Sequence, residues 1–151
     1  MARYFLDTSA LVKYYHAEVG TPAVSSMFAE LGRTVLISSL GFLEMQSAIA
    51  MKVRSGALEG ASAGLLRGRL MLDIAAGAIE VYSVAEDHFI GAERLIGRHA
   101  FARRLRTLDA LQLAIALDLQ SQGLVDTFVT ADQALAEAAS REGLSVIDPT
   151  L

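Results

Sequence analysis

The sequence contains no cysteine and only 2 prolines among its 151 residues. The lack of cysteine excludes a disulfide scaffold, a thiolate metal site and cysteine catalysis together. With 53% hydrophobic and 20% charged residues, the composition also excludes collagen-like and disordered classes. No apolar run approaches the ~20 residues that span a bilayer, and the N-terminus has no signal-peptide pattern. We therefore expect a cytoplasmic protein without a membrane partner.

The length and the net charge limit the interpretation further. A chain of this length is typical of one compact domain, so we expect residues 1–151 to form a single domain. The formal net charge is −4. An acidic average argues against a protein that binds nucleic acid by bulk electrostatic attraction.

Short runs of β-branched and aromatic residues alternate with longer alanine- and leucine-rich patterns of helical period. The expected strands are Arg3–Leu6, Thr34–Ser38, Ile79–Ser83, Thr127–Thr130 and Ser145–Ile147. The expected helices cover about 9–17, a segment that Thr21 caps ahead of Pro22, a long segment that ends near Ser55, and about 57–76, 86–98, 107–122 and 132–142. Apolar strands separated by helices predict a parallel sheet covered on both faces, which is a three-layer α/β/α sandwich of about five strands.

Two acidic residues follow predicted strands at the edge of the sheet where such folds bind ligands. Asp7 comes directly after the first strand, and Asp132 follows the strand that ends at Thr130. Ligands of open parallel sheets bind beyond the carboxyl ends of the strands. Asp126 precedes the same strand and is therefore expected at the opposite edge.

Two further acids lie in apolar segments. Glu44 is surrounded by the sequence LGFLEMQSAIAM, and Asp109 opens the helical sequence LDALQLAIAL. A carboxylate in such surroundings needs a partner or an upward shift of its pKa. Arg106, three residues before Asp109, is in reach as a partner for that residue.

Each acid taken alone also has an ordinary structural interpretation. Asp7 suits a turn, Glu44 suits a solvated helix edge, and Asp109 suits the first turn of a helix that Thr107 caps. Thr130 and Gln133 fit a capping box that would make Asp132 a first-turn acid. We favour the joint interpretation, because clustered carboxylates are a recognised signal of a functional site.

Four neighbouring carboxylates repel one another and are best neutralised by a hard divalent cation. Oxygen ligands without histidine or cysteine favour Mg²⁺ or Mn²⁺ over zinc. One or two such ions activate water and stabilise the attacking and leaving oxygens of a phosphodiester. The acids therefore predict metal-dependent phosphodiester hydrolysis.

The chain resembles the PIN-domain nucleases, and among them the VapC-type toxins of bacterial toxin–antitoxin pairs. The matching blocks, in family order, are FLDTSALVKYY at 5–15, Ser38 and Ser39 with Glu44, RTLDALQLAIAL at 106–117, FVTAD at 128–132 and GLSVIDP at 143–149. Any one block is weakly specific, whereas the ordered set covers essentially the whole chain.

This resemblance implies a metal-dependent endoribonuclease with a PIN-like sheet of five parallel strands. It implies that Asp7, Glu44, Asp109 and Asp132 form the catalytic metal site, and that Ser9 and Thr130 support it by hydrogen bonds. It also implies an RNA substrate, a homodimer and a cognate VapB-like antitoxin that covers the site. The fourth acid is the position that varies most within the family.

Five of the 13 basic residues lie between positions 94 and 106, beside the predicted site. Arginine binds phosphate through its planar fork of donors, so this stretch is a candidate surface for RNA or for an acidic antitoxin. A solvated helix face is the alternative. The candidates are Arg98, Arg103, Arg104 and Arg106.

Two other functions fit parts of the pattern. One is an aspartate-nucleophile phosphotransferase, in which Asp7 attacks phosphorus. That chemistry in its commonest form needs a second acid two residues later, where this chain has Ser9. It also needs a lysine further along the chain, but no lysine follows Lys52. The other is a non-catalytic interaction module whose acids bind a metal or an arginine of a partner.

Overall fold

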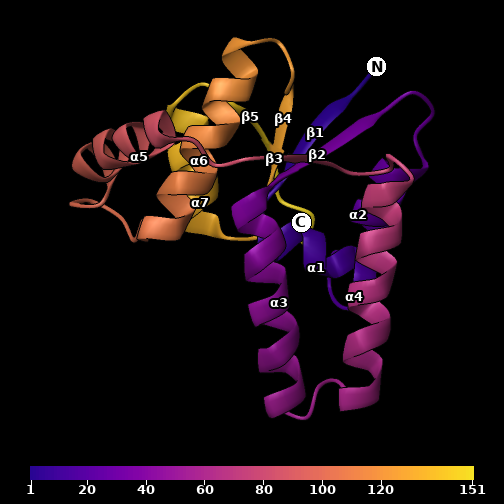
Figure 1. The fold of residues 1–151 in the computed structure, drawn as a ribbon. Helices are drawn as coiled ribbons and strands as arrows, with labels where there is room; N and C mark the ends of the chain where they lie inside the picture. The colour runs from indigo at the N-terminus through magenta and orange to yellow at the C-terminus, as the bar shows by residue number, and fades with distance from the viewer.

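The structure is a computed structural model that describes residues 1–151, and its five strands form one parallel sheet (Figure 1). The order across the sheet is β3-β2-β1-β4-β5, with every neighbouring pair parallel. The strands are β1 (Arg3–Leu6), β2 (Thr34–Ser38), β3 (Glu80–Tyr82), β4 (Thr127–Val129) and β5 (Ser145–Ile147). The chain builds outward from β1 in one direction and then in the other, so the topological switch point lies between β1 and β4.

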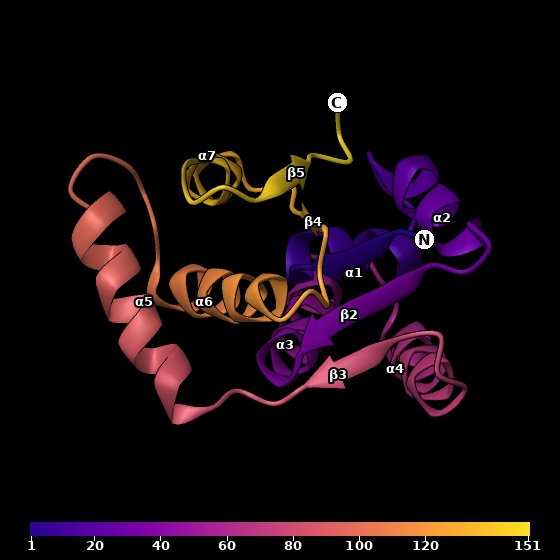
Figure 2. The same cartoon turned by 90° about the horizontal axis from the view of Figure 1, so that it is seen from above.

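Seven helices cover the two faces of the sheet (Figure 2). Those that pack on one face are α1 (Thr8–Tyr15), α2 (Thr21–Ala29), α3 (Ser39–Arg54) and α4 (Gly60–Ala75). Those that pack on the other are α5 (Glu86–His99), α6 (Thr107–Ser121) and α7 (Gln133–Arg141). The predicted three-layer α/β/α architecture is therefore confirmed.

Alternate residues of the central strands point into two separate cores. Phe5 and Phe128 stack on each other in the core beneath α5, α6 and α7, with ring centroids 5.7 Å apart. Leu6 and Val129, the next residues of the same strands, lie in the core beneath α1 to α4. This period of two is the reason that short, continuously apolar strands form a sheet buried on both faces.

Helices α3 and α4 run side by side in opposite directions and extend together beyond the sheet (Figure 1). Their contacts with each other, with α1 and with the sheet hold this pair in place. None of the seven helices combines the length and the apolar character that crossing a bilayer requires.

Several element boundaries differ from the sequence-based prediction. Gly20, rather than Thr21, caps α2, because the hydroxyl of Thr21 donates instead to the carbonyl oxygen of Lys13. The N-cap of α6 is Arg106 instead of Thr107. Helix α1 begins at Thr8 because the side chain of Asp7 caps it.

Candidate active site

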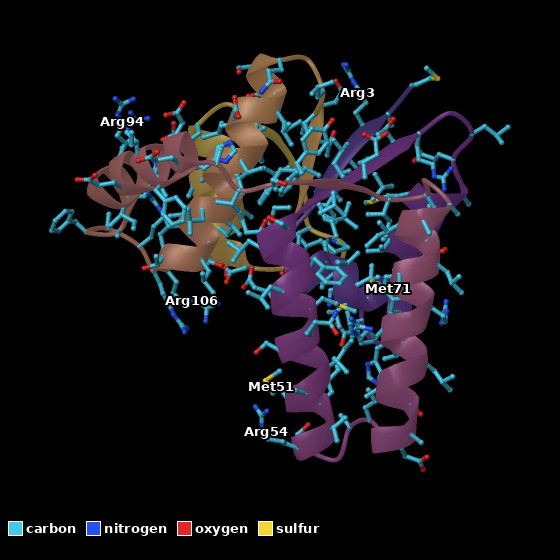
Figure 3. All side chains as sticks on the ribbon, in the orientation of Figure 1. Arg3, Met51, Arg54, Met71, Arg94 and Arg106 are labelled. Atoms are coloured by element: carbon cyan, nitrogen blue, oxygen red, sulfur yellow. The ribbon has the colours of Figure 1, made fainter.

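A cavity of about 970 Å³ opens at the carboxyl edge of the sheet, beside the switch point between β1 and β4. Its walls come from the start of α1, one side of α3 and the first turns of α6 and α7. In Figure 3, Arg106 and the side chains of Met51 and Arg54 project toward the same open side of the molecule. All four predicted acids line this cavity: Asp7, Glu44, Asp109 and Asp132.

Asp7 is the most buried of the four acids, with 5% of its surface exposed. Its Oδ1 accepts hydrogen bonds from the Ser9 hydroxyl at 2.7 Å and from the backbone N–H of Ala10 at 3.0 Å, and the latter bond caps α1. Its Oδ2 accepts a hydrogen bond from the Thr130 hydroxyl at 2.7 Å. Burial raises the pKa of Asp7 to about 6, helped by the nearby charge of Asp109 and opposed by these three hydrogen bonds.

Ser9 and Thr130 fasten Asp7 to the loop that follows β4. The Ser9 hydroxyl accepts from the backbone N–H of Ala131 at 2.9 Å, and the Thr130 hydroxyl accepts from that of Asp132 at 3.1 Å. Each hydroxyl is therefore oriented to donate its hydrogen to a carboxylate oxygen of Asp7. The two residues predicted to support the site both contact its most buried acid.

Asp109 and Asp132 face each other across the guanidinium of Arg106. The Arg106 Nε donates to Asp109 Oδ2 at 3.2 Å, and its Nη2 lies 3.6 Å from Asp132 Oδ2. The other oxygen of Asp132 accepts from the backbone N–H of Leu135 and caps α7. The hydrogen bond to Asp109 is the main reason that the pKa of Arg106 is raised. The pairing of Arg106 with Asp109 confirms the sequence-based expectation, whereas the contact with Asp132 was not foreseen.

Glu44 is held by a buried amide that the sequence-based analysis missed. The Gln112 side chain, 2% exposed, donates from Nε2 to Glu44 Oε1 at 3.0 Å. Its own Oε1 accepts from the hydroxyl of Ser38 at 2.8 Å. That hydroxyl donates because the carboxylate of Glu44 accepts the NH₂ end of the amide, which leaves the amide oxygen of Gln112 facing Ser38.

This chain of hydrogen bonds fixes which end of the Gln112 amide faces Glu44. The NH₂ end points at the carboxylate, so the amide donates this hydrogen bond and Glu44 accepts it. The sequence does carry one signal of this buried contact, since Gln112 is the single amide in the apolar segment LDALQLAIAL. A polar group at a fully apolar helix position requires a buried partner.

The four candidate arginines do not form one surface. Arg98 forms two hydrogen bonds with Glu142, and Arg103 contacts His99 and Glu137. Arg104 is exposed and lines a shallow hollow with Asp132. Only Arg106 lines the acidic cavity. As expected, Asp126 lies at the opposite edge of the sheet, where it pairs with Arg3.

The donors in the cavity suit a hard divalent cation held with few protein ligands. They are carboxylate and hydroxyl oxygens, and a guanidinium already lies between two of the carboxylates. No three acidic or histidine side chains converge closely enough to hold one ion together. Mg²⁺ commonly binds through one or two carboxylates and retains several waters, so the residues fit that ion. Such a site is suited to chemistry on phosphate esters.

Solved structures with the same fold cover nearly the whole chain. VapC20 of Mycobacterium tuberculosis, described as a toxin that cleaves the sarcin–ricin loop, superposes with a TM-score of 0.67 at 18% identity, over 93% of this chain and 95% of that one. FitAcB from Neisseria gonorrhoeae superposes with a TM-score of 0.66 at 17% identity, over 97% of each chain. DNA-bound VapBC from Salmonella typhimurium gives 0.65 at 16% identity, over 99% of each.

The sequence itself matches a family model. No curated protein matches the chain, but the model of the PIN domain matches residues 4–141. These residues include β2, β3, β4, all of β1 but its first residue, and all four acids that line the cavity, while β5 lies beyond them. The chain belongs to the PIN domain family.

Proposed function

We propose that this chain is a Mg²⁺- or Mn²⁺-dependent endoribonuclease, and that it is the VapC-type toxin of a toxin–antitoxin pair. The observation that carries the proposal is the cavity of a PIN domain lined by Asp7, Glu44, Asp109 and Asp132. Carboxylates gathered at the switch point of a parallel sheet are the arrangement expected of a metal-dependent hydrolase. The toxin assignment is supported by structural neighbours that are described as a toxin and as a toxin–antitoxin complex.

In this proposal the acids hold the metal, and the neighbouring groups hold the acids. A bound divalent ion supplies the Lewis acidity for phosphodiester hydrolysis. Ser9 and Thr130 orient both oxygens of Asp7, and Gln112 orients one oxygen of Glu44. These bonds keep each carboxylate in one position, which is what a preorganised site requires.

The partners follow from the same proposal. The substrate is RNA, the chain acts as one PIN domain over residues 1–151, and it forms a homodimer. Arg98, Arg103, Arg104 and Arg106 remain candidates for contact with RNA or with a VapB-like antitoxin. Arg104 and Arg106 are the better two, because both lie beside Asp132 at the acidic cavity, whereas Arg98 and Arg103 pair with residues that do not line it.

The phosphotransferase alternative is disfavoured by the surroundings of Asp7. A nucleophilic carboxylate needs an oxygen free to approach phosphorus. Both oxygens of Asp7 accept hydrogen bonds within the protein, and the residue is 5% exposed. Retention of phosphate on Asp7 after incubation with a phosphate donor would nevertheless establish that alternative.

The test is cleavage of a structured RNA by the purified chain with Mg²⁺, with Mn²⁺ and with EDTA. Cleavage should require the metal, and Asp7→Asn and Asp109→Asn should each abolish it. Asp126→Asn is the matched control, since it makes the same chemical change at the other edge of the sheet. This variant should cleave the RNA as the unmodified protein does. Equal cleavage by all the variants would refute the site, and tight binding of a small partner without any cleavage would favour an interaction module.

A further inference from the structure

Arg106 is the one basic side chain that forms ion pairs with the acids of the cavity. It contacts Asp109 Oδ2 and Asp132 Oδ2, while 60% of its own side chain is exposed. Its residue is the N-cap of α6, but its side chain makes no capping hydrogen bond there. The guanidinium is therefore held by the two acids and by nothing else in the protein, and it can move without disturbing the packing.

Arg106 contacts both carboxylates that a metal ion would use at this side of the cavity. At Asp132 it contacts Oδ2, the oxygen that does not accept the backbone N–H of Leu135. At Asp109 it donates from Nε to Oδ2. A divalent ion bound by these carboxylates would therefore compete with the guanidinium for Asp132 Oδ2 and lie close to its charge at Asp109. The ion carries twice the charge of the guanidinium and repels it, so the two are not expected to occupy these carboxylates together.

A released guanidinium would lie at the rim of the cavity, next to the bound ion. The side chain is long and mostly solvent-exposed, and its planar fork of donors matches the geometry of a phosphate group. An RNA phosphate drawn to the ion would therefore come within its reach. Arg104, two residues earlier, has no ion pair with these acids and is equally available with or without metal.

We propose that Arg106 exchanges partners during the cycle of the enzyme. It pairs with Asp109 and Asp132 while the site lacks an ion, and it binds a backbone phosphate of the RNA once a divalent ion has taken those carboxylates. The inference rests on the proposed nuclease function, because it needs both a metal and a nucleic acid. It assigns Arg106 a role that depends on metal, unlike that of a simple basic surface residue.

The first measurement is Mn²⁺ binding to the metal-free protein by calorimetry. Arg106→Gln should bind Mn²⁺ about two- to fivefold more tightly than the unmodified protein, because a half-exposed ion pair that competed with the metal is gone. Arg104→Gln removes the same charge and should change the affinity by less than about twofold. Thermal unfolding of both variants in EDTA verifies that they are folded.

The second measurement is anisotropy of a fluorescein-labelled 12-nucleotide oligothymidylate at low salt, which carries the phosphodiester backbone without the ribose 2′-hydroxyl. With Mn²⁺, Arg106→Gln should bind it about tenfold more weakly than the unmodified protein, with a salt dependence reduced by about 0.7 in log–log slope. Without Mn²⁺, the two proteins should bind it alike. Arg104→Gln should change the affinity for the oligonucleotide by the same factor with and without Mn²⁺.

The opposite signs of the two effects separate partner exchange from its alternatives. If Arg106 only stabilised the fold, its replacement would weaken both Mn²⁺ binding and oligonucleotide binding. Unchanged or weaker Mn²⁺ binding by Arg106→Gln would overturn the exchange, as would a loss of oligonucleotide affinity that is the same with and without Mn²⁺. If the unmodified protein binds no Mn²⁺ at all, the proposed function fails together with the exchange, whereas equal Mn²⁺ binding by both proteins refutes the exchange alone.

Discussion

Replacing Asp7 by asparagine should stabilise the fold at neutral pH while abolishing activity. The carboxyl group is 5% exposed and close to the charge of Asp109, and burial is the main reason that its pKa rises from 3.8 to about 6. Above pH 6 the protein must therefore keep a buried negative charge. Asparagine removes that charge, keeps the size of the side chain and is as good an N-cap as aspartate.

The size of the effect follows from the pKa. Each pKa unit corresponds to about 1.4 kcal/mol, so moving from 3.8 to about 6 destabilises the folded state by about 3 kcal/mol above pH 6. The new amide must still hydrogen-bond to Thr130, which reduces the gain. We expect a net stabilisation of about 1 to 3 kcal/mol, or roughly 2 to 12 °C in Tm.

The sign of the pH dependence is specific. Between pH 3.8 and 6 the Asp7 carboxyl of the folded protein retains a proton that the unfolded chain releases, so the contribution of Asp7 to stability falls as the pH rises through this window. The stability advantage of Asp7→Asn should grow over the same window and stay constant above it. Urea unfolding of both proteins from pH 4 to pH 8, in EDTA, measures this difference. Added Mg²⁺ should reduce the difference, because the ion stabilises only the charged site.

Asp126→Asn provides a control with the opposite trend. The hydrogen bond from Arg3 is the main reason that the pKa of Asp126 is lowered, so this carboxylate stabilises the fold above its unfolded pKa, and the stabilisation is lost as the pH falls. Its replacement should therefore destabilise the protein by a similar amount from pH 8 to pH 5, and this effect should disappear only below the unfolded pKa of 3.8. A stability difference for Asp7→Asn that does not change with pH, or a loss of stability at pH 8, would refute the reasoning about the buried charge.

Three further predictions concern groups that hold the site or the helices in place. Gln112→Met should cost about 1 to 3 kcal/mol in urea unfolding, since the Ser38 hydroxyl loses its acceptor and Glu44 keeps only the longer hydrogen bond from Thr8. The variant should also weaken Mn²⁺ binding in calorimetry, and unaltered Mn²⁺ affinity would count against the role of Gln112 in orienting Glu44. Thr130→Val removes a donor to Asp7, so the pKa of Asp7 should rise further and stability at pH 8 should fall more than at pH 4. Glu142→Gln should lower the Tm by several degrees, because Arg98 and His99 lose their shared carboxylate; an unchanged Tm would make this cluster unimportant for holding α5 to α7.

Most of the fold could be predicted from the sequence, because the patterns that indicate strands and helices lie within short segments. Strand β1 is apolar where both of its faces are buried, and that requirement appears in three consecutive residues, Tyr4, Phe5 and Leu6. Boundaries were less predictable. Thr21 resembles a capping residue, but its hydroxyl found an acceptor in the carbonyl oxygen of Lys13, eight residues earlier, and Gly20 caps the helix instead.

The candidate site was readable only in part. Asp7 follows β1 directly and Asp132 comes three residues after the end of β4, so parallel strand direction brings both to one edge. Glu44 and Asp109 were singled out by their apolar neighbours in sequence and by the family resemblance. Nothing in the local sequence of Arg98 or Arg103 indicated that they pair with Glu142 and Glu137 rather than face solvent.

The sequence by itself determined the parallel α/β sandwich and which acids lie at its carboxyl edge, because burial periodicity and strand direction are properties of short segments. Only the tertiary structure decided what each charge contacts. The bond from Thr130 to Asp7 joins residues 123 positions apart, and that from Gln112 to Glu44 joins residues 68 apart. Such partners are set by the order of the strands and by the reach of individual side chains. The same geometry decided that one arginine of a basic cluster, Arg106, lies among the acids, while Arg98 and Arg103 pair elsewhere.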